Sequence, residues 1–129
     1  MRFRPLLATL LLAVTAVGTT AAVNAPATFD ITLARTATGW SATCASGCAW
    51  TEVTMDCAAQ CQAVISETGM RTQRTEGIAD EAFAFVVAPR GTGGWQATSI
   101  RGTAWSETSI GCGAAQCRAR IDGTGVTRL

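Results

Sequence analysis

The strongest constraint on the fold is an internal repeat. Residues 39–69 read GWSATCASGCAWTEVTMDCAAQCQAVISETG, and residues 94–125 read GWQATSIRGTAWSETSIGCGAAQCRARIDGTG. With Gly113 treated as a single insertion, 17 of 31 aligned positions are identical. Two copies of one supersecondary unit can bury together an apolar face that neither could bury alone. The repeat therefore predicts a duplicated fold in which each copy helps to interpret the other.

Hydrophobic residues after the N-terminal region alternate with polar ones, which is the period of a β-strand. Phe29, Ile31 and Leu33 alternate ahead of the first copy, and Phe83 and Phe85 do so ahead of the second. Short segments of this kind are separated by glycine-containing turns. We therefore predict an all-β protein: an antiparallel meander duplicated in tandem, forming a small sandwich or barrel of roughly eight to ten strands.

The N-terminal segment resembles a secretory signal peptide in its layout. Arg2 and Arg4 precede an apolar run of 12 residues, Leu6 to Val17. That run is too short to cross a bilayer, which needs about 20 residues. We predict a bacterial signal peptide over residues 1–25, with cleavage between 22 and 27, and export to the periplasm or the medium. Residues 26–129 then form a single β-domain of two repeats, about 28–75 and 83–129, with no transmembrane anchor.

The charge balance of the remaining chain excludes a strongly basic protein. Outside Arg2 and Arg4, 8 arginines face 9 acidic residues. Affinity for nucleic acids or anionic membranes depends on a positive surface field. The composition therefore predicts no nucleic-acid partner.

Six cysteines in a small exported domain predict three disulfides. The repeat selects the partners, because Cys44 and Cys48 are both replaced in the second copy, by Ser99 and Thr103. Cysteines that are lost together are most simply explained as a bonded pair. The predicted disulfides, all local, are Cys44–Cys48, Cys57–Cys61 and Cys112–Cys117.

Four closely spaced cysteines in the first copy also suggest a zinc site. Export, the absence of histidine and the loss of two of the four cysteines in the second copy argue against that interpretation. We therefore expect neither a metal nor another cofactor.

A short turn is predicted between the cysteines of the first pair. Ala45, Ser46 and Gly47 would form a three-residue hairpin loop, with the glycine in a left-handed conformation. The second copy keeps this glycine as Gly102. Simple pairing through the turn places Trp40 on the same side of the sheet as Trp50 and Glu52, away from the predicted core.

The motif Trp-x-Glu occurs in both copies, each time with a second tryptophan upstream. Two interpretations follow: aromatic patches with a carboxylate that bind sugars or peptides, or indole rings that cover a sheet face. Preservation in both copies favours the structural interpretation, because duplicated folds keep packing residues. The candidate binding residues are Trp40, Trp50, Glu52, Trp95, Trp105 and Glu107.

Most catalytic mechanisms are excluded by composition. The chain has no histidine and no lysine, so a Ser-His-Asp triad and a Schiff base cannot be built. Only carboxylates remain, and Glu52 with Glu107 could form a glycosidase pair if the copies met face to face. We therefore expect a non-enzymatic binding or envelope-associated protein whose partner is a glycan or an envelope protein. The alternatives are a carbohydrate- or peptide-binding module using the tryptophan patches and, third, a carboxylate glycoside hydrolase.

Overall fold

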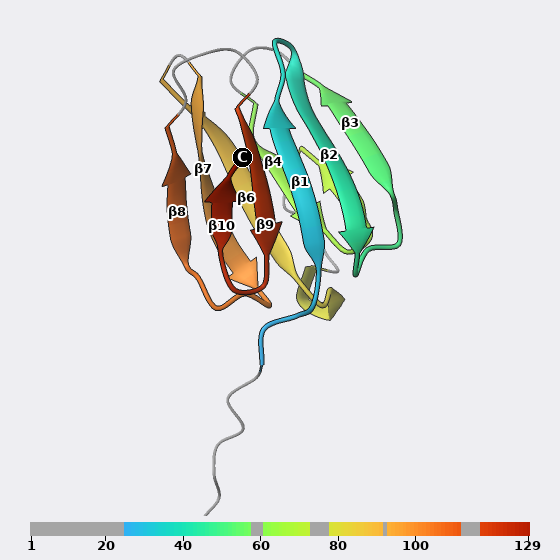
Figure 1. Cartoon of the computed structure of the whole chain (residues 1–129). Helices are drawn as coiled ribbons and strands as arrows, with labels where there is room; N and C mark the ends of the chain where they lie inside the picture. Colours follow the sequence, from blue (N-terminus) through green and yellow to red (C-terminus); the bar gives the residue numbers. More distant parts are fainter. Residues whose placement is uncertain (1–24, 58–60, 73–77, 92, 112–116) are drawn as a thin grey trace, which may run out of the picture.

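The chain folds into two antiparallel β-sheets packed face to face (Figure 1). The computed structural model describes residues 25–57, 61–72, 78–91, 93–111 and 117–129. The all-β prediction is confirmed, and the form is a small sandwich. Residues 1–24, which include almost all of the predicted signal peptide, lie outside the described ranges.

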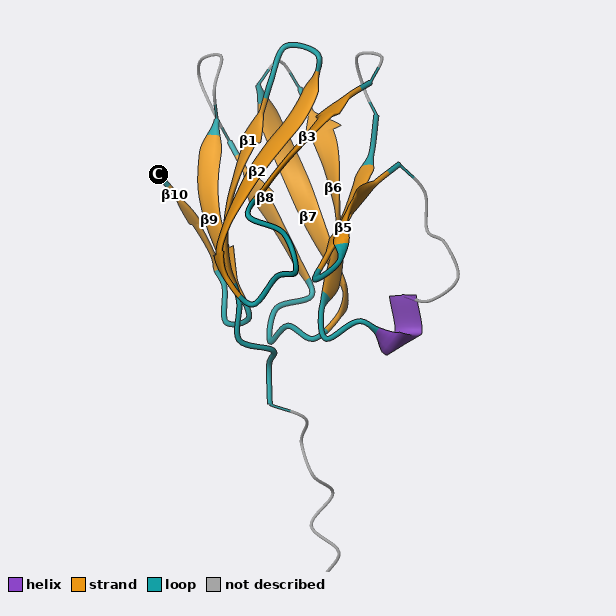
Figure 2. Cartoon of the chain, turned by 90° about the vertical axis from the view of Figure 1, so that its right-hand side faces the viewer, coloured by secondary structure: helices purple, strands orange, loops and turns teal. Residues whose placement is uncertain are grey.

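Ten strands and one short helix make up the described part of the chain. The strands are β1 (Asp30–Arg35), β2 (Gly39–Ser46), β3 (Glu52–Asp56), β4 (Ala63–Ser66), β5 (Gly69–Arg71), β6 (Ala84–Arg90), β7 (Gly94–Arg101), β8 (Glu107–Ile110), β9 (Arg118–Asp122) and β10 (Val126–Arg128). A single 3-10 turn, η1 (Ile78–Asp80), lies outside the sandwich (Figure 2). Among the described residues, no helix is long and apolar enough to cross a membrane.

The two sheets have corresponding strand orders. Sheet A is β10-β9-β1-β2-β3, and sheet B is β5-β4-β6-β7-β8. If β1 to β5 are matched in order with β6 to β10, each strand of sheet A has its counterpart at the same place in sheet B. This correspondence agrees with the repeat, although a duplication of the chain stays a prediction.

The chain changes sheets after its third strand in each half. β3 belongs to sheet A, but β4 and β5 belong to sheet B, where β4 pairs with β6. In the same way β8 belongs to sheet B, while β9 pairs with β1 in sheet A. The prediction that each copy forms one continuous meander is therefore wrong, because each half gives its last hairpin to the sheet of the other half.

Aromatic side chains from corresponding positions meet at the centre of the sandwich. Phe29 stacks on Phe83 with ring centroids 3.8 Å apart, and Trp40 meets Trp95 edge-on at 6.1 Å. Burying large aromatic side chains is the main source of stability in a domain of this size. Contacts between the halves therefore supply much of the core.

Trp40 and Trp95 lie in the core, which corrects the predicted sorting of faces. β2 pairs with β3 in the register Trp40↔Met55 and Ala42↔Val53, whereas simple pairing through a three-residue turn would place Trp40 opposite Glu52. A shift by three residues is odd, and an odd shift moves every side chain to the opposite face of a strand. The connection 47–51 is longer than the predicted three-residue turn. The side chains of β2 therefore lie on the opposite faces of the sheet from those predicted.

Gly47 and Gly102 adopt the left-handed conformation that the turn prediction required, with φ values of 84° and 78°. A Cβ atom at Gly47 would lie 2.3 Å from the carbonyl oxygen of Thr28, and one at Gly102 would lie 2.2 Å from that of Ala82. Both glycines are therefore required by close backbone contact as well as by their dihedral angles.

The predicted disulfide Cys44–Cys48 is present, with Cα atoms 6.3 Å apart. At the corresponding positions of the other half, the hydroxyl groups of Thr103 and Ser99 are hydrogen-bonded to each other. Thr103 donates its own hydrogen to the carbonyl oxygen of Trp105 at 2.6 Å, so Ser99 is the donor in the bond between the hydroxyls. A hydrogen-bonded hydroxyl pair therefore occupies the place of the disulfide.

The second predicted disulfide, Cys57–Cys61, is also present, with Cα atoms 5.9 Å apart. This local disulfide lies where the chain passes from β3 in sheet A to β4 in sheet B, so it does not close a hairpin within one sheet. Cys117 is disulfide-bonded as well, whereas its predicted partner Cys112 lies outside the described residues.

The two core indoles differ in their hydrogen bonding. Trp40 Nε1 donates to the carbonyl oxygen of Cys61 at 3.1 Å, but Trp95 Nε1 has no hydrogen-bond partner in the described structure. The corresponding acceptor, the carbonyl oxygen of Cys117, receives the backbone N–H of Arg35 at 3.3 Å. The residue that corresponds to Arg35 is Pro89, which has no N–H. Because Pro89 cannot donate to the Cys61 carbonyl oxygen, that oxygen accepts the hydrogen bond from the Trp40 indole.

We predict that the double substitution Cys44→Ser with Cys48→Thr lowers the free energy of unfolding by only about 1 kcal/mol. A disulfide closing so short a loop contributes roughly 2 kcal/mol, and a new hydroxyl hydrogen bond returns about half of that. Urea denaturation of the oxidised protein measures the change. The double alanine variant is the control and should lose about 2 kcal/mol; equal losses in the two variants would contradict the hydroxyl replacement.

We predict that Trp40→Phe destabilises the protein by about 1 kcal/mol more than Trp95→Phe does. Both substitutions leave a similar cavity, but only the first removes a hydrogen bond and leaves a carbonyl unpaired. Denaturant midpoints of the two single variants provide the comparison. An equal loss, or a larger one for Trp95→Phe, would show that the two indoles are energetically equivalent.

Candidate functional site

Two of the predicted binding residues are inaccessible. Trp40 is 1% exposed and Trp95 is 0% exposed. Neither ring can stack on a ligand in this structure. These two upstream tryptophans are therefore core residues, which agrees with the structural interpretation.

The other two tryptophans are half-buried and tied to backbone carbonyls of their own half. Trp50 Nε1 donates to the carbonyl oxygen of Ser66 at 3.0 Å, and Trp105 Nε1 donates to that of Asp122 at 2.9 Å. The Trp105 ring also packs edge-on against Phe85, at a centroid distance of 5.8 Å. Each indole thus attaches the connection after β2 or β7 to the turn of a neighbouring hairpin.

The two motif carboxylates are not brought together. Glu52 lies exposed on β3, and Glu107 lies exposed on β8. These strands lie on opposite sides of the sandwich (Figure 1), since β3 contacts β5 at the far edge of sheet B from β8. β5 and β8 are the two edges of sheet B, four strand spacings or about 19 Å apart. A glycosidase pair needs carboxyl groups within about 10 Å, so the face-to-face approach on which a Glu52–Glu107 pair depended is not found in this structure.

Metal ligation has no candidate in the part of the chain that the structure describes. No group of three or more histidine, cysteine, aspartate or glutamate residues lies close enough there to hold an ion.

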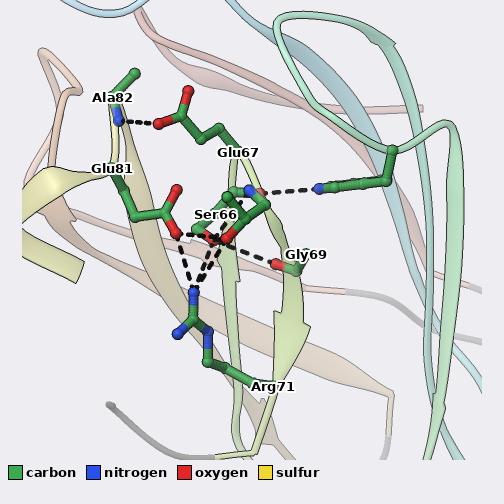
Figure 3. A network of polar contacts seen from close by, with 8 residues as sticks. Ser66, Glu67, Gly69, Arg71, Glu81 and Ala82 are labelled. Carbon is green, nitrogen blue, oxygen red and sulfur yellow. Dashed lines mark hydrogen bonds and ion pairs between the residues drawn. The ribbon is translucent and has the colours of Figure 1, made fainter. Parts of the chain in front are cut away.

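A buried carboxylate network joins the β4–β5 turn to the segment after η1 (Figure 3). Glu81 is 6% exposed, and its Oε1 atom accepts hydrogen bonds from Thr68 Oγ1 and from Arg71 Nη2, the latter at 3.0 Å. Arg71 Nη2 also lies 3.3 Å from Ser66 Oγ. This ion pair fixes the segment that leads into β6.

The corresponding turn of the other half uses an aspartate. Asp122 Oδ1 accepts hydrogen bonds from the backbone N–H and the hydroxyl of Thr124, at 2.8 and 2.7 Å, and from Gly125 N at 2.9 Å. The hydroxyl bond from Thr124 is the main reason that the pKa of Asp122 lies below its usual value, while partial burial opposes that shift. Both polar clusters are explained by the turns that they hold, so neither is a candidate site.

The outer face of sheet B carries a hollow of about 410 Å³, which we call the sheet B hollow. Its floor is formed by small or apolar side chains between long polar ones. Gln96 pairs with Ala88 across β6 and β7, and Gln62 lies beside Ala88 from the other side, one residue beyond the pair Ala63↔Val87. The lining residues are Gln62, Val86, Ala88, Pro89, Arg90, Gln96 and Thr98.

Gln96 is the most unusual residue of the sheet B hollow. The residue as a whole is only 8% exposed, and its side chain makes no hydrogen bond to a described residue. Its amide atoms are not among the buried polar atoms that lack a partner, so the amide reaches solvent at the sheet B hollow. Gln96 therefore presents unused donors and an unused acceptor to this cavity.

The outer face of sheet A carries different side chains at the positions that correspond to the sheet B hollow. The positions that correspond to Gln62, Val86 and Gln96 hold Arg118, Thr32 and Ser41. On that face Arg120 forms a bidentate ion pair with Asp30, with both contacts at 2.9 Å. The outer face of sheet A is therefore charged and self-paired, whereas that of sheet B offers unpaired amides around an apolar floor.

The turn next to Arg90 is fastened to sheet A. Arg35 Nη1 donates hydrogen bonds to the carbonyl oxygens of Gly94 at 2.8 Å and Gly91 at 3.3 Å. These bonds fix the backbone on both sides of the β6–β7 turn, and Arg90 precedes it directly. The covered position of Gln96 gave no signal in the sequence.

Searches against protein-family models, curated proteins and solved structures find no significant match. The function must therefore be inferred from the geometry of the protein itself.

We predict that Glu81→Gln lowers the free energy of unfolding by about 2 kcal/mol. The change removes the charge that Arg71 pairs with in a largely buried place. Thermal or urea denaturation measures the loss. Glu67→Gln is the matched control, because its side-chain oxygen can still accept the N–H of Ala82, now 2.8 Å away. A similar loss in both variants would show that the buried ion pair has no special importance.

Proposed function

We propose that the protein is an exported, non-enzymatic binding domain that holds a small polar ligand in the sheet B hollow. The observation that carries this proposal is Gln96, which lines the hollow from a largely covered position and makes no hydrogen bond to a described residue. Its amide therefore offers donors and an acceptor to a ligand at the hollow.

The shape of the sheet B hollow supports this proposal. Ligand sites are concave, have volumes of about 300–1,000 Å³ and combine apolar surface with a few polar groups. The sheet B hollow has such a combination, with Val86, Ala88 and Pro89 beside two amides and one guanidinium. Its strands are held rigidly within a five-stranded sheet, so the polar groups are pre-organised.

The composition supports binding rather than catalysis. The chain lacks histidine and lysine, and the described cysteines are disulfide-bonded. The sheet B hollow contains no carboxylate that could act as a general acid or base.

The disulfides support export. Cys44–Cys48 and Cys57–Cys61 are stable in oxidising compartments such as the bacterial periplasm. Together with the signal-like residues 1–25, they support our proposal of an exported domain in the envelope or the medium.

We predict that a titration with small polar molecules shifts the side-chain amide resonances of Gln96 and Gln62 in a 15N-correlated NMR spectrum. The panel contains neutral sugars, sugar acids, amino acids and short peptides at millimolar concentration. Gln96→Ser, which introduces the residue found at the corresponding position of sheet A, should abolish the shifts while the protein stays folded.

Ser41→Ala on sheet A is the control and should leave the titration unchanged. Shifts confined to the indole resonances of Trp50 and Trp105 would instead support binding by the tryptophan patches. A spectrum that no member of the panel changes would contradict the proposed function.

A further inference from the structure

We infer that the ligand of the sheet B hollow is a sugar acid, such as a hexuronic acid residue of an anionic polysaccharide. This inference rests on the proposed function, and it follows from four properties of the hollow. They are its charge, its hydrogen-bonding groups, its floor and its position in the sheet.

Charge favours an anion. Among the described residues, Arg90 is the only charged one that lines the sheet B hollow, and it is exposed. A guanidinium recognises a carboxylate through two parallel hydrogen bonds. The backbone next to Arg90 is fixed by the bonds from Arg35, so its side chain starts from a defined place.

The remaining polar groups favour hydroxyls. Gln62 and Gln96 each offer donors and an acceptor, and Thr98 offers a hydroxyl. A sugar hydroxyl also donates and accepts, so it can use both functions of each amide. A simple carboxylate or phosphate could use only the donors.

The floor has the dimensions of one sugar ring. Gln96 lies on β7 and Gln62 directly precedes β4, the two strands that flank β6, so their backbones are about 10 Å apart, at two strand spacings. Ala88 and Val86 lie between them with little side-chain volume. An apolar floor of this kind suits the C–H face of a pyranose.

The charges along the strands give the ligand an orientation. Arg90 lies at one end of the sheet B hollow and Thr98 at the other, where Glu107 is the direct cross-strand neighbour of Thr98. A carboxylate at Arg90 and hydroxyls near Thr98 and Glu107 match the two ends of a hexuronic acid. A dicarboxylate of similar length would bring its second charge towards Glu107.

The position of the sheet B hollow argues against an extended peptide. Peptides that recognise a β-sheet usually add to an edge with free backbone groups. β4, β6 and β7 each have a paired strand on both sides. A ligand at the sheet B hollow must therefore use side chains, as a sugar does.

The inference is tested by NMR and calorimetric titration of the whole domain with five probes: galacturonate, glucuronate, galactose, glucose and succinate. We expect one of the two sugar acids to bind at least about tenfold more tightly than its neutral counterpart and than succinate. Arg90→Gln should remove this preference, a loss of about tenfold in affinity for the acid, because one charge-assisted contact disappears. Arg118→Gln, which removes an exposed arginine from sheet A, is the control and should leave the affinity unchanged.

Equal binding of neutral and acidic sugars at Gln96 would overturn the inferred ligand class and leave the proposed function intact. Succinate binding as tightly as the sugar acids would do the same. If none of the five probes shifts the Gln96 amide, the sugar-acid inference fails. The proposed function then depends on the amino acids and peptides of the wider panel.

Discussion

The connection 47–51 determines which side of sheet A becomes the core, and the equivalent connection after β7 does so for sheet B. In both places the register between neighbouring strands differs by an odd number from that of a short hairpin. Trp40 and Trp95 consequently point inward and meet each other. The outward positions of β2 and β7 then fall to Ser41 and Gln96. Both the core and the proposed binding surface follow from this register.

Alternating hydrophobic residues were sufficient to predict the all-β class and most strands, because Phe29, Ile31 and Leu33 show the period of a half-buried strand. The joint loss of Cys44 and Cys48 identified a disulfide that the structure contains. Which side chains of β2 point into the core was not predictable. It depends on how many residues of the connection to β3 stay unpaired between the two strands. The exchange of hairpins was not predictable either, since strand patterns do not say which sheet a strand joins.

Differences between the halves locate the candidate site. Where the halves agree, their residues bury side chains or hold turns, as Trp50 and Trp105 do. Where they differ, sheet A has the ion pair of Arg120 with Asp30 on its surface, and sheet B has a hollow lined by Gln96. Glutamine gave no sequence signal here, because an amide on a strand is normally a solvated residue. Only its burial on an outward face makes Gln96 distinctive.

The pairing of β1 with β9 has a consequence for biosynthesis. The first strand of the sandwich obtains its second neighbour from residues 118–122, close to the C-terminus. Contacts between such distant segments form slowly and late. Sheet A therefore cannot be completed before residues 118–122 have been made, and an emerging polypeptide keeps one edge of β1 open until then. A chain with this topology stays incompletely folded until both halves of the sandwich have left the ribosome.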